Sequence, residues 1–286
     1  MSFFRVTPEQ MRAFHSDGYF VAEGLLQPME VDPLRKIARS EYETAETASR
    51  ADGEGGAIRL HVENDVADDV YGAIVSSRRI VNTMEQLLDG EVYHYHHKLI
   101  LKEPRTGGAW AWHQDYGYWY NNGCLFPQLA SCLIAVDRAT RENGCLQVIR
   151  GSHQIGRVDH MKVGDQTGAD PERVEAALNR LERVYVELEP GSAVIFHCNL
   201  LHRSDQNTSE NPRWALIACY NAAANNPYKK SRHPCYTPLT VMDDSEVARV
   251  ATRSARRTRS PLVGPDSTCH GGRWLTTCPA QFARPR

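Results

Sequence analysis

The chain has 286 residues, of which 41% are hydrophobic and 24% charged, so it can bury a substantial core in one large β domain or two smaller ones. Its 33 basic and 35 acidic residues nearly cancel, which argues against a global field that would attract nucleic acid, a membrane surface or an acidic polymer. We therefore expect a small-molecule partner, no nucleic-acid or membrane partner, and a monomer or homodimer.

The first predicted element is a helix over residues 7–18. Thr7 suits the N-cap, Pro8 the first helical position and Gly18 the stop. These three residue types at this spacing predict a short helix that begins and ends sharply.

Two further helices are predicted before residue 91. Apolar residues recur at roughly helical spacing over about 27–47, and a third helical pattern covers 76–90 and is closed by Gly90. The intervening residues 49–60 are rich in glycine and charge, so we expect a loop there.

From residue 91 onward the pattern changes to strands. A helical pattern over 170–184 interrupts them and is interpreted as an insertion. Helices followed by strands with long connections indicate a mainly β fold with flanking helices, an antiparallel sandwich or barrel. Runs rich in β-branched and aromatic residues, separated by turn residues, cover 91–104, 131–139, 145–153, 183–190, 192–197 and 213–223.

The last part of the chain has a different composition. Residues 249–286 hold eight arginines, no lysine and one acid, Asp266, with little apolar material to fold around. We therefore expect a domain over 1–244 and an arginine-rich C-terminal tail over 245–286, disordered or loosely packed. A tail that binds nucleic acid is the alternative interpretation.

The eight cysteines show no Cys-x-x-Cys pair and no dense framework spacing. Most lie in apolar runs, where a free thiol behaves as a small hydrophobic group. Reduced cysteines, an N-terminus broken by charges and no segment of membrane-spanning length together predict a cytoplasmic protein.

The run AWAWHQDYGYW, residues 109–119, contains a histidine and an aspartate two positions apart. In a strand, His113 and Asp115 would project from the same face while Gln114 points away. Two imidazoles and one carboxylate form the triad that binds Fe(II) in non-haem oxygenases and leaves coordination positions open. A lone His-x-Asp occurs often by chance, so this hypothesis requires a second imidazole from elsewhere in the chain.

Residues 191–221 provide candidates for that imidazole. His197 and His202 lie near the end of an apolar run, and Arg213 opens the next strand 11 residues after His202. A cosubstrate such as 2-oxoglutarate would chelate the metal and leave its second carboxylate for a buried arginine, with Ser204 on the same face as His202. These residues alone do not decide between His197 and His202.

Several segments together resemble the phytanoyl-CoA dioxygenase family of Fe(II)/2-oxoglutarate oxygenases, which includes ectoine hydroxylase. The resemblance covers most of residues 10–225 and none of the arginine-rich tail. It implies a double-stranded β-helix, a jelly roll of the cupin-like type, with iron near one mouth of the barrel. The segments are FHSDGYFVAEGLL (14–26), HQD (113–115), RENGCLQVIRGSH (141–153) and FHCNLLHRSDQNTSENPR (196–213).

The resemblance also implies the metal ligands, namely His113, Asp115 and His202. It selects His202 because the family's ligand is the histidine followed by x-Ser and then, 11 residues later, by arginine. His197 is then structural or lies beside the ligands. Asp115 favours hydroxylation, since related halogenases lack this carboxylate.

For the cosubstrate, the resemblance implies that Arg213 and Ser204 contact a carboxylate of 2-oxoglutarate. Gln114 and Trp119 match positions that line the cofactor pocket.

Two lysines near these positions, Lys98 and Lys102, are interpreted as solvated side chains of a strand; contact of one of them with the cofactor or the substrate is the alternative. No cluster of basic residues marks a CoA site, so a CoA thioester is not the expected substrate.

The predicted activity is hydroxylation of an unactivated C–H bond of a small molecule, with Fe(II) as cofactor. O₂ and 2-oxoglutarate are consumed, one oxygen atom enters the product, and succinate and CO₂ are released. Two alternatives use the same fold. A zinc-dependent hydrolase would employ the same triad but gives Arg213 no role. A non-catalytic binding protein would have no use for an intact triad.

Overall fold

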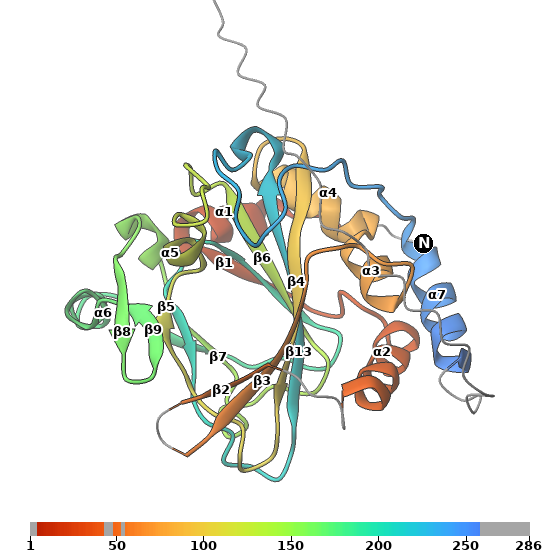
Figure 1. Cartoon of the computed structure of the whole chain (residues 1–286), viewed down its shortest axis with the longest axis horizontal. Coiled ribbons are helices and arrows are strands. Elements are labelled where there is room, and N and C mark those ends of the chain that lie inside the picture. Colours follow the sequence, from red (N-terminus) through yellow and green to blue (C-terminus); the bar gives the residue numbers. More distant parts are fainter. Residues whose placement is uncertain (1–4, 43–47, 53–54, 258–286) are drawn as a thin grey trace, which may run out of the picture.

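Antiparallel strands form the centre of the molecule. The computed structural model describes residues 5–42, 48–52 and 55–257 (Figure 1). Its larger sheet has seven strands in the order β1-β11-β6-β13-β4-β3-β2. In that order they are Tyr19–Ala22, Ala193–His197, Leu129–Ala135, Arg213–Ala222, Val92–Lys102, Ala57–Glu63 and Ala48–Ala51.

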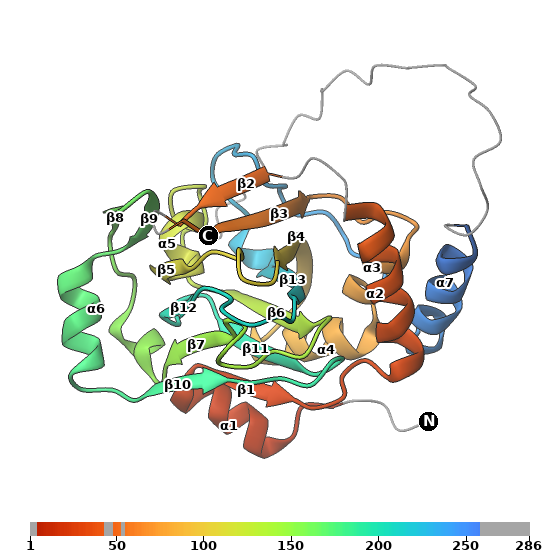
Figure 2. The same ribbon diagram turned by 90° about the horizontal axis from the view of Figure 1, so that it is seen from below.

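A smaller four-stranded sheet faces the larger one, as the view in Figure 2 shows. An apolar cluster with side chains from both sheets, among them Ile217, Phe196 and Val148, fills the space between them. This arrangement is a double-stranded β-helix, or jelly roll, so the predicted fold class is confirmed. The smaller sheet has the order β10-β7-β12-β5, which is Arg183–Val186, Leu146–Ile149, His202–Ser204 and Trp110–His113; a separate hairpin pairs β8 (His160–Val163) with β9 (Gln166–Ala169).

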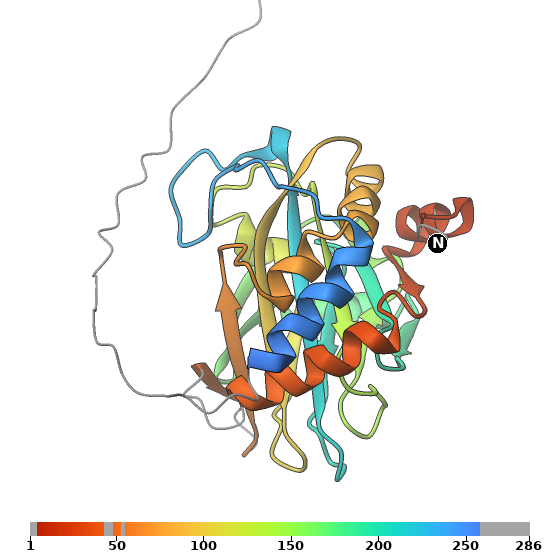
Figure 3. The same ribbon diagram turned by 90° about the vertical axis from the view of Figure 1, so that its right-hand side faces the viewer.

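Helices cover the outer face of the larger sheet. Figure 3 shows α2 and α7 crossing this face with α3 beside them. Their apolar side chains and those of α4 pack on the outward-pointing residues of the sheet in a second apolar cluster. The helices are α1 (Pro8–Asp17), α2 (Pro28–Tyr42), α3 (Val70–Val75), α4 (Arg78–Leu87), α5 (Asp115–Trp119), α6 (Pro171–Leu178) and α7 (Asp244–Arg257).

Burial on both faces explains why strand β13 is apolar from Trp214 to Cys219. Every residue of this strand is buried. Alternate side chains point to opposite faces, so Leu216 and Ala218 pack toward the helices while Ala215, Ile217 and Cys219 pack between the sheets. A strand covered on both faces has no position at which a solvated polar residue fits.

The first predicted helix is confirmed in detail. The Thr7 hydroxyl caps α1 by accepting a hydrogen bond from the backbone N–H of Gln10. In turn, the side-chain oxygen of Gln10 accepts a hydrogen bond from the backbone N–H of Thr7. Gly18 ends the helix with φ of 85°, a left-handed conformation that glycine adopts without strain.

The predicted loop over residues 49–60 is wrong. Strands β2 and β3 form an antiparallel hairpin at the edge of the larger sheet. Gly55 and Gly56 lie between the two strands, whereas Ile58 and Leu60 alternate with less buried neighbours along β3. The period-two signal was too short to stand out beside the glycines.

Other element boundaries differ from the prediction by several residues. The second and third helices exist as α2 and α4, but α2 ends at Tyr42, and residues 43–47 lie outside the described part. The helical insertion is shorter than expected because β10 begins at Arg183. Strands β1, β8, β9 and β12 and helix α3 were not anticipated, since each is short and held by tertiary pairing or packing rather than local pattern.

The predicted start of the loose tail at residue 245 is also wrong. Helix α7 covers Asp244–Arg257 and packs against α2 and α3. Val247, Val250 and Ala251 are buried at one face of this helix, which is apolar enough to dock despite the arginines. Residues 258–286 of the predicted tail lie outside the described residues.

No helix among the described residues combines the length and the apolar character that a membrane crossing requires.

The packing of α7 can be tested with a pair of substitutions. Val250→Asp places a charge at a position that is 2% exposed and should lower the free energy of unfolding by about 3 kcal/mol or more. Thr252→Asp, at an exposed position of the same helix, should change it by about 0.5 kcal/mol or less. Urea unfolding of both variants measures the difference; equal effects would show that α7 does not dock.

Candidate metal centre

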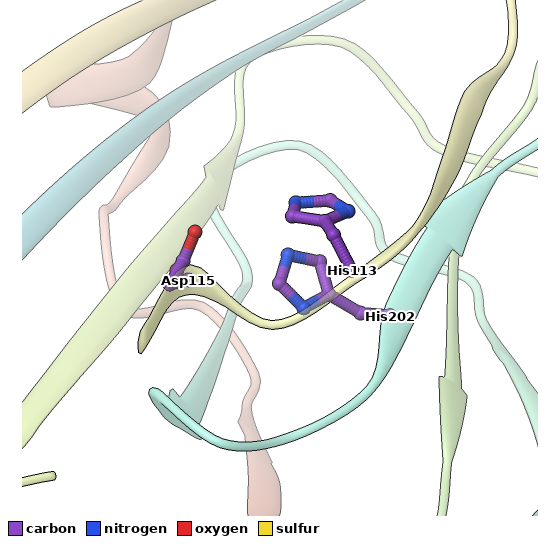
Figure 4. A group of neighbouring side chains, drawn as sticks. All are labelled: His113, Asp115 and His202. Atoms are coloured by element: carbon purple, nitrogen blue, oxygen red, sulfur yellow. The ribbon is translucent and has the colours of Figure 1, made fainter. Parts of the chain in front are cut away.

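Three buried side chains converge where β5, β12 and α5 meet. His113, Asp115 and His202 each offer one ligand atom, and these atoms all lie within 4.8 Å of one another. Figure 4 shows the two imidazole rings close together, with their planes inclined to each other and the Asp115 side chain beside them. Such a spacing suits one metal ion bound by two nitrogens and one oxygen.

Strand pairing brings the two histidines together. His202 of β12 lies directly opposite His113 of β5 in the antiparallel pair, and their ring centroids are 4.0 Å apart. Residues that face each other in such a pair project from the same side of the sheet. The His202 ring also contacts the Phe196 ring, with the ring centroids 4.9 Å apart.

Asp115 reaches the cluster by a different route from the one predicted. The strand ends at His113, and Asp115 is the first residue of α5, so the two do not share a strand face. The turn occurs because the backbone N–H of Gln114 donates to Nε2 of His160 instead of joining the ladder. Gly117 allows this approach, since a Cβ there would lie 2.0 Å from the His160 ring.

Ser131 of β6 orients the Asp115 carboxylate. Its hydroxyl donates to Oδ2 of Asp115 over 2.9 Å and is itself fully buried. Ser131 could not be identified from the sequence, because nothing in the run SCLIAVDRA indicates which residue would face the carboxylate. Partners of this kind hold metal-binding side chains in place.

Each imidazole is also held in one tautomer. Nδ1 of His113 lies 2.8 Å from the carbonyl oxygen of Ala111, and Nδ1 of His202 lies 2.9 Å from that of Leu200. A carbonyl only accepts, so Nδ1 carries the hydrogen and Nε2 has a free lone pair. Burial lowers the pKa of His202, and lowers that of His113 well below its usual value, so both rings are neutral.

Gln114 and Trp119 adjoin the cluster in different ways. The Gln114 amide donates to the carbonyls of Gly156 and Asn199 and accepts from the N–H of Val158, so it ties this corner of the molecule to two loops. Trp119 is buried and lies four residues after Asp115 on α5, which places both on one side of that helix.

A second buried feature lies beside the cluster. Arg213 is 3% exposed, its Nε donates to the carbonyl of Gly144, and it forms no ion pair with any described residue. Burial lowers its pKa to about 10, so the guanidinium stays charged near neutral pH. A buried cation without a carboxylate partner favours the binding of an anion.

Lys102 stands next to Arg213, which the sequence analysis did not expect. The two residues face each other across β4 and β13, and Lys102 is 0% exposed, so its interpretation as a solvated lysine is wrong. Its Nζ donates to the Ser204 hydroxyl over 2.9 Å. Burial, with Arg213 nearby, lowers the pKa of Lys102 well below its usual value.

Ser204 links the two features. It lies two residues after His202 on β12, and both side chains are buried while Arg203 between them is less so. Residues two apart on a strand are separated by about 7 Å. The cationic pair of Lys102 and Arg213 thus lies at a distance from the cluster that suits a short dicarboxylate.

The other candidate histidine, His197, is not part of the cluster. Its ring lies 5.9 Å from that of Phe14 of α1, and its Nδ1 accepts the backbone N–H of Asn199. Burial lowers its pKa to about 4. Its contacts are those of a packing residue between β11 and α1.

The donor set and its surroundings define a class of protein. Two neutral imidazoles and one carboxylate, inside a double-stranded β-helix and next to an unpaired buried arginine, are the arrangement of the non-haem iron oxygenases. The residues fit Fe(II) because all three ligand atoms are oriented by hydrogen bonds and converge without a fourth protein ligand among the described residues.

Comparison with known proteins agrees with this class. Residues 14–215 match the family described as phytanoyl-CoA dioxygenase (PhyH). The chain is 32% identical over 246 residues to the L-proline trans-4-hydroxylase of Streptomyces griseoviridis, covering 80% of this chain and 90% of that protein. It is 27% identical over 240 residues to the ectoine dioxygenase of Sphingopyxis alaskensis, covering 77% of each.

Solved structures of EctD from S. alaskensis show the same fold. The crystal structure with 2-oxoglutarate and 5-hydroxyectoine has a TM-score of 0.72 and 26% identity, covering 83% of this chain and 88% of that one. The crystal structure with bound Fe gives a TM-score of 0.70 over the same shares. The chain belongs to the phytanoyl-CoA dioxygenase family.

The hydrogen bond from Ser131 should contribute to metal affinity. Ser131→Ala leaves the Asp115 carboxylate free to rotate, and we expect the Kd for Mn²⁺, a stable substitute for Fe(II), to rise about tenfold or more. Titration calorimetry measures this value. Cys132→Ala, at the neighbouring residue that points toward the helices, is the control and should leave the Kd unchanged. An unchanged Kd in Ser131→Ala would contradict the role of this hydroxyl.

Proposed function

We propose that this protein is a non-haem Fe(II)- and 2-oxoglutarate-dependent dioxygenase that hydroxylates an unactivated C–H bond of a small molecule and releases succinate and CO₂. The observation that carries the proposal is the buried cluster of His113, Asp115 and His202 within the fold of this family. Proteins similar to this chain include an L-proline hydroxylase and ectoine dioxygenases.

In this proposal the three residues of the cluster are the metal ligands. Nε2 of His113, Nε2 of His202 and a carboxylate oxygen of Asp115 would bind one face of Fe(II) and leave the opposite positions for 2-oxoglutarate and O₂. The metal, when bound, supplies the oxidative chemistry. The protein supplies oriented ligands and exclusion of water.

The second carboxylate of 2-oxoglutarate is assigned to the cationic pair. Arg213 offers two parallel N–H donors to a carboxylate, and Lys102 and Ser204 stand beside it as further donors. The support for this assignment is the absence of an ion-pair partner for Arg213 among the described residues. Gln114 and Trp119 are proposed as neighbours of the cosubstrate, with Gln114 acting mainly through the loops it holds.

The substrate is proposed to be a compact amino acid or amino-acid derivative. L-proline and ectoine stand in the names of two of the proteins to which the chain is similar. The zinc-hydrolase alternative has no support from the similar proteins, and the non-catalytic alternative leaves the oriented ligands without a role.

We further propose a cytoplasmic location. Five cysteines in the described part of the chain are buried free thiols, as expected of a protein from a reducing compartment: Cys124, Cys132, Cys145, Cys198 and Cys219. A monomer or homodimer remains the expectation for the oligomeric state.

The activity can be tested by succinate release. Purified protein loaded anaerobically with Fe(II) and then given O₂ and 2-oxoglutarate should form succinate, and a substrate from a panel of amino acids should increase the rate. His113→Ala should reduce the rate to background because it removes one of the metal ligands. Succinate formation that is equal in both proteins would refute the oxygenase function.

The role of Arg213 predicts a selective defect. Arg213→Ala should raise the 2-oxoglutarate concentration for half-maximal rate about 100-fold, because a bidentate contact to a desolvated carboxylate is lost, while the Kd for Mn²⁺ stays unchanged. Arg213→Lys, which keeps the charge but not the paired donors, should show an intermediate effect. Equal loss of metal and cosubstrate binding would indicate a structural role instead.

A further inference from the structure

His96 of β4 belongs to neither the metal cluster nor the cationic pair. Its side chain is 3% exposed, and its Nδ1 is fully buried without a hydrogen-bond partner among the described residues. A buried polar atom left unpaired costs about 1–3 kcal/mol. Packing alone does not require a histidine at this position, so the unpaired Nδ1 calls for an explanation.

A β-bulge places His96 on the inner face of the larger sheet. Cys219 of β13 pairs with His96, but the next residue, Tyr220, pairs with His94, so Tyr95 is the extra residue. His94 therefore lies on the outer side, where it contacts Tyr220. Without the bulge, His94 and His96 would share one face.

The strand register connects His96 to the metal cluster. Ser131, Cys219 and His96 form one row across β6, β13 and β4, and the Ser131 hydroxyl, which binds Asp115, also contacts Sγ of Cys219 at 3.4 Å. Neighbouring strands are about 4.8 Å apart, so His96 lies about 10 Å from Ser131 along the row. That span suits a compact substrate placed between His96 and the cluster.

Aromatic rings hold the His96 ring from two sides. The His233 ring is stacked on it, with centroids 4.5 Å apart and planes inclined by 21°. Trp119 of α5 makes an edge contact at 5.7 Å. Nδ1 of His233 lies 3.1 Å from Oδ1 of Asn64, which fixes the stacking ring in turn. These contacts fix the orientation of the His96 ring, whereas the Nδ1 of His96 stays unpaired.

The charges around this group are positive. Burial lowers the pKa of His96 well below its usual value, and Lys98, two residues along the strand, lowers it further. Burial lowers the pKa of His233 to about 4, with Arg232 and Lys98 as the next causes. The charged partners of both rings within the described residues are basic, Lys98 and Arg232, so an anionic group is the ligand that this position favours.

We propose that His96 is a substrate-recognition residue, whose Nδ1–H donates to a carboxylate of the substrate, with His233 stacking to position the ring. The proposal rests on the oxygenase function above and narrows the substrate class to small carboxylic acids, amino and imino acids included. The His96 ring contacts Trp119, which lies on the helix that begins with Asp115. A substrate bound by His96 would therefore have a fixed position relative to the metal cluster.

The test compares His96→Phe and His96→Gln with wild-type protein. Phenylalanine keeps a ring for stacking but removes the donor, whereas glutamine keeps a donor of similar reach. His97→Phe is the matched control, since His97 is a buried histidine on the same strand whose ring stacks on Tyr71 outside the barrel.

L-proline and its uncharged analogue L-prolinamide are the probes, each scored by stimulated succinate release. If L-proline does not stimulate release in the wild type, the panel of carboxylic amino acids, each with its amide, replaces it. We expect His96→Phe to raise KM for the acid about tenfold or more, with little change for the amide. His96→Gln should recover part of the loss, and His97→Phe should match the wild type.

A binding measurement distinguishes failure of this proposal from failure of the proposed function. It follows the binding of 2-oxoglutarate to the Fe(II) protein without O₂ by visible absorption. If the wild type does not bind 2-oxoglutarate, the proposed function itself fails. If it binds 2-oxoglutarate but no carboxylic acid on the panel stimulates succinate release, the substrate proposal alone fails. Equal acid-to-amide preference in His96→Phe and wild type would also overturn it.

Discussion

The antiparallel pairing of β12 with β5 is the contact on which the site depends. It sets His202 opposite His113 and brings Ser204, two residues further on, toward the buried cations of the larger sheet. Backbone hydrogen bonds hold this register, and the apolar cluster between the sheets keeps them at a constant separation. A shift of one residue would turn both His202 and Ser204 to the opposite face.

Charge is distributed unevenly inside the barrel. Arg213 and Lys102 lie at one end of the site, and Lys98 acts on both His113 and His202. The only carboxylate of the metal cluster is Asp115. Arg213 is a buried cation without an ion-pair partner among the described residues, and Lys98 adds a positive charge near the cluster; both are consistent with a dicarboxylate cosubstrate and with an acidic substrate.

Local irregularities of the backbone place the chemistry. The turn from β5 into α5 directs Asp115 toward the histidines, and the bulge in β4 turns His96 inward. Gly117 tolerates the ring of His160 against its Cα, so the turn depends on a contact between segments more than 40 residues apart. None of these irregularities follows from hydrophobic periodicity, which describes regular elements only.

Caps and apolar runs are local signals, so they predict the first helix and a mainly β fold with flanking helices, whereas the jelly roll and the choice of His202 over His197 came from the family resemblance. The tertiary structure was needed to show that Asp115 starts a helix, that Ser131 orients it, that Lys102 is buried and that α7 docks on α2. The reason is physical: pairing across strands and burial between layers join residues far apart in the chain, and no short pattern records which partner each side chain meets.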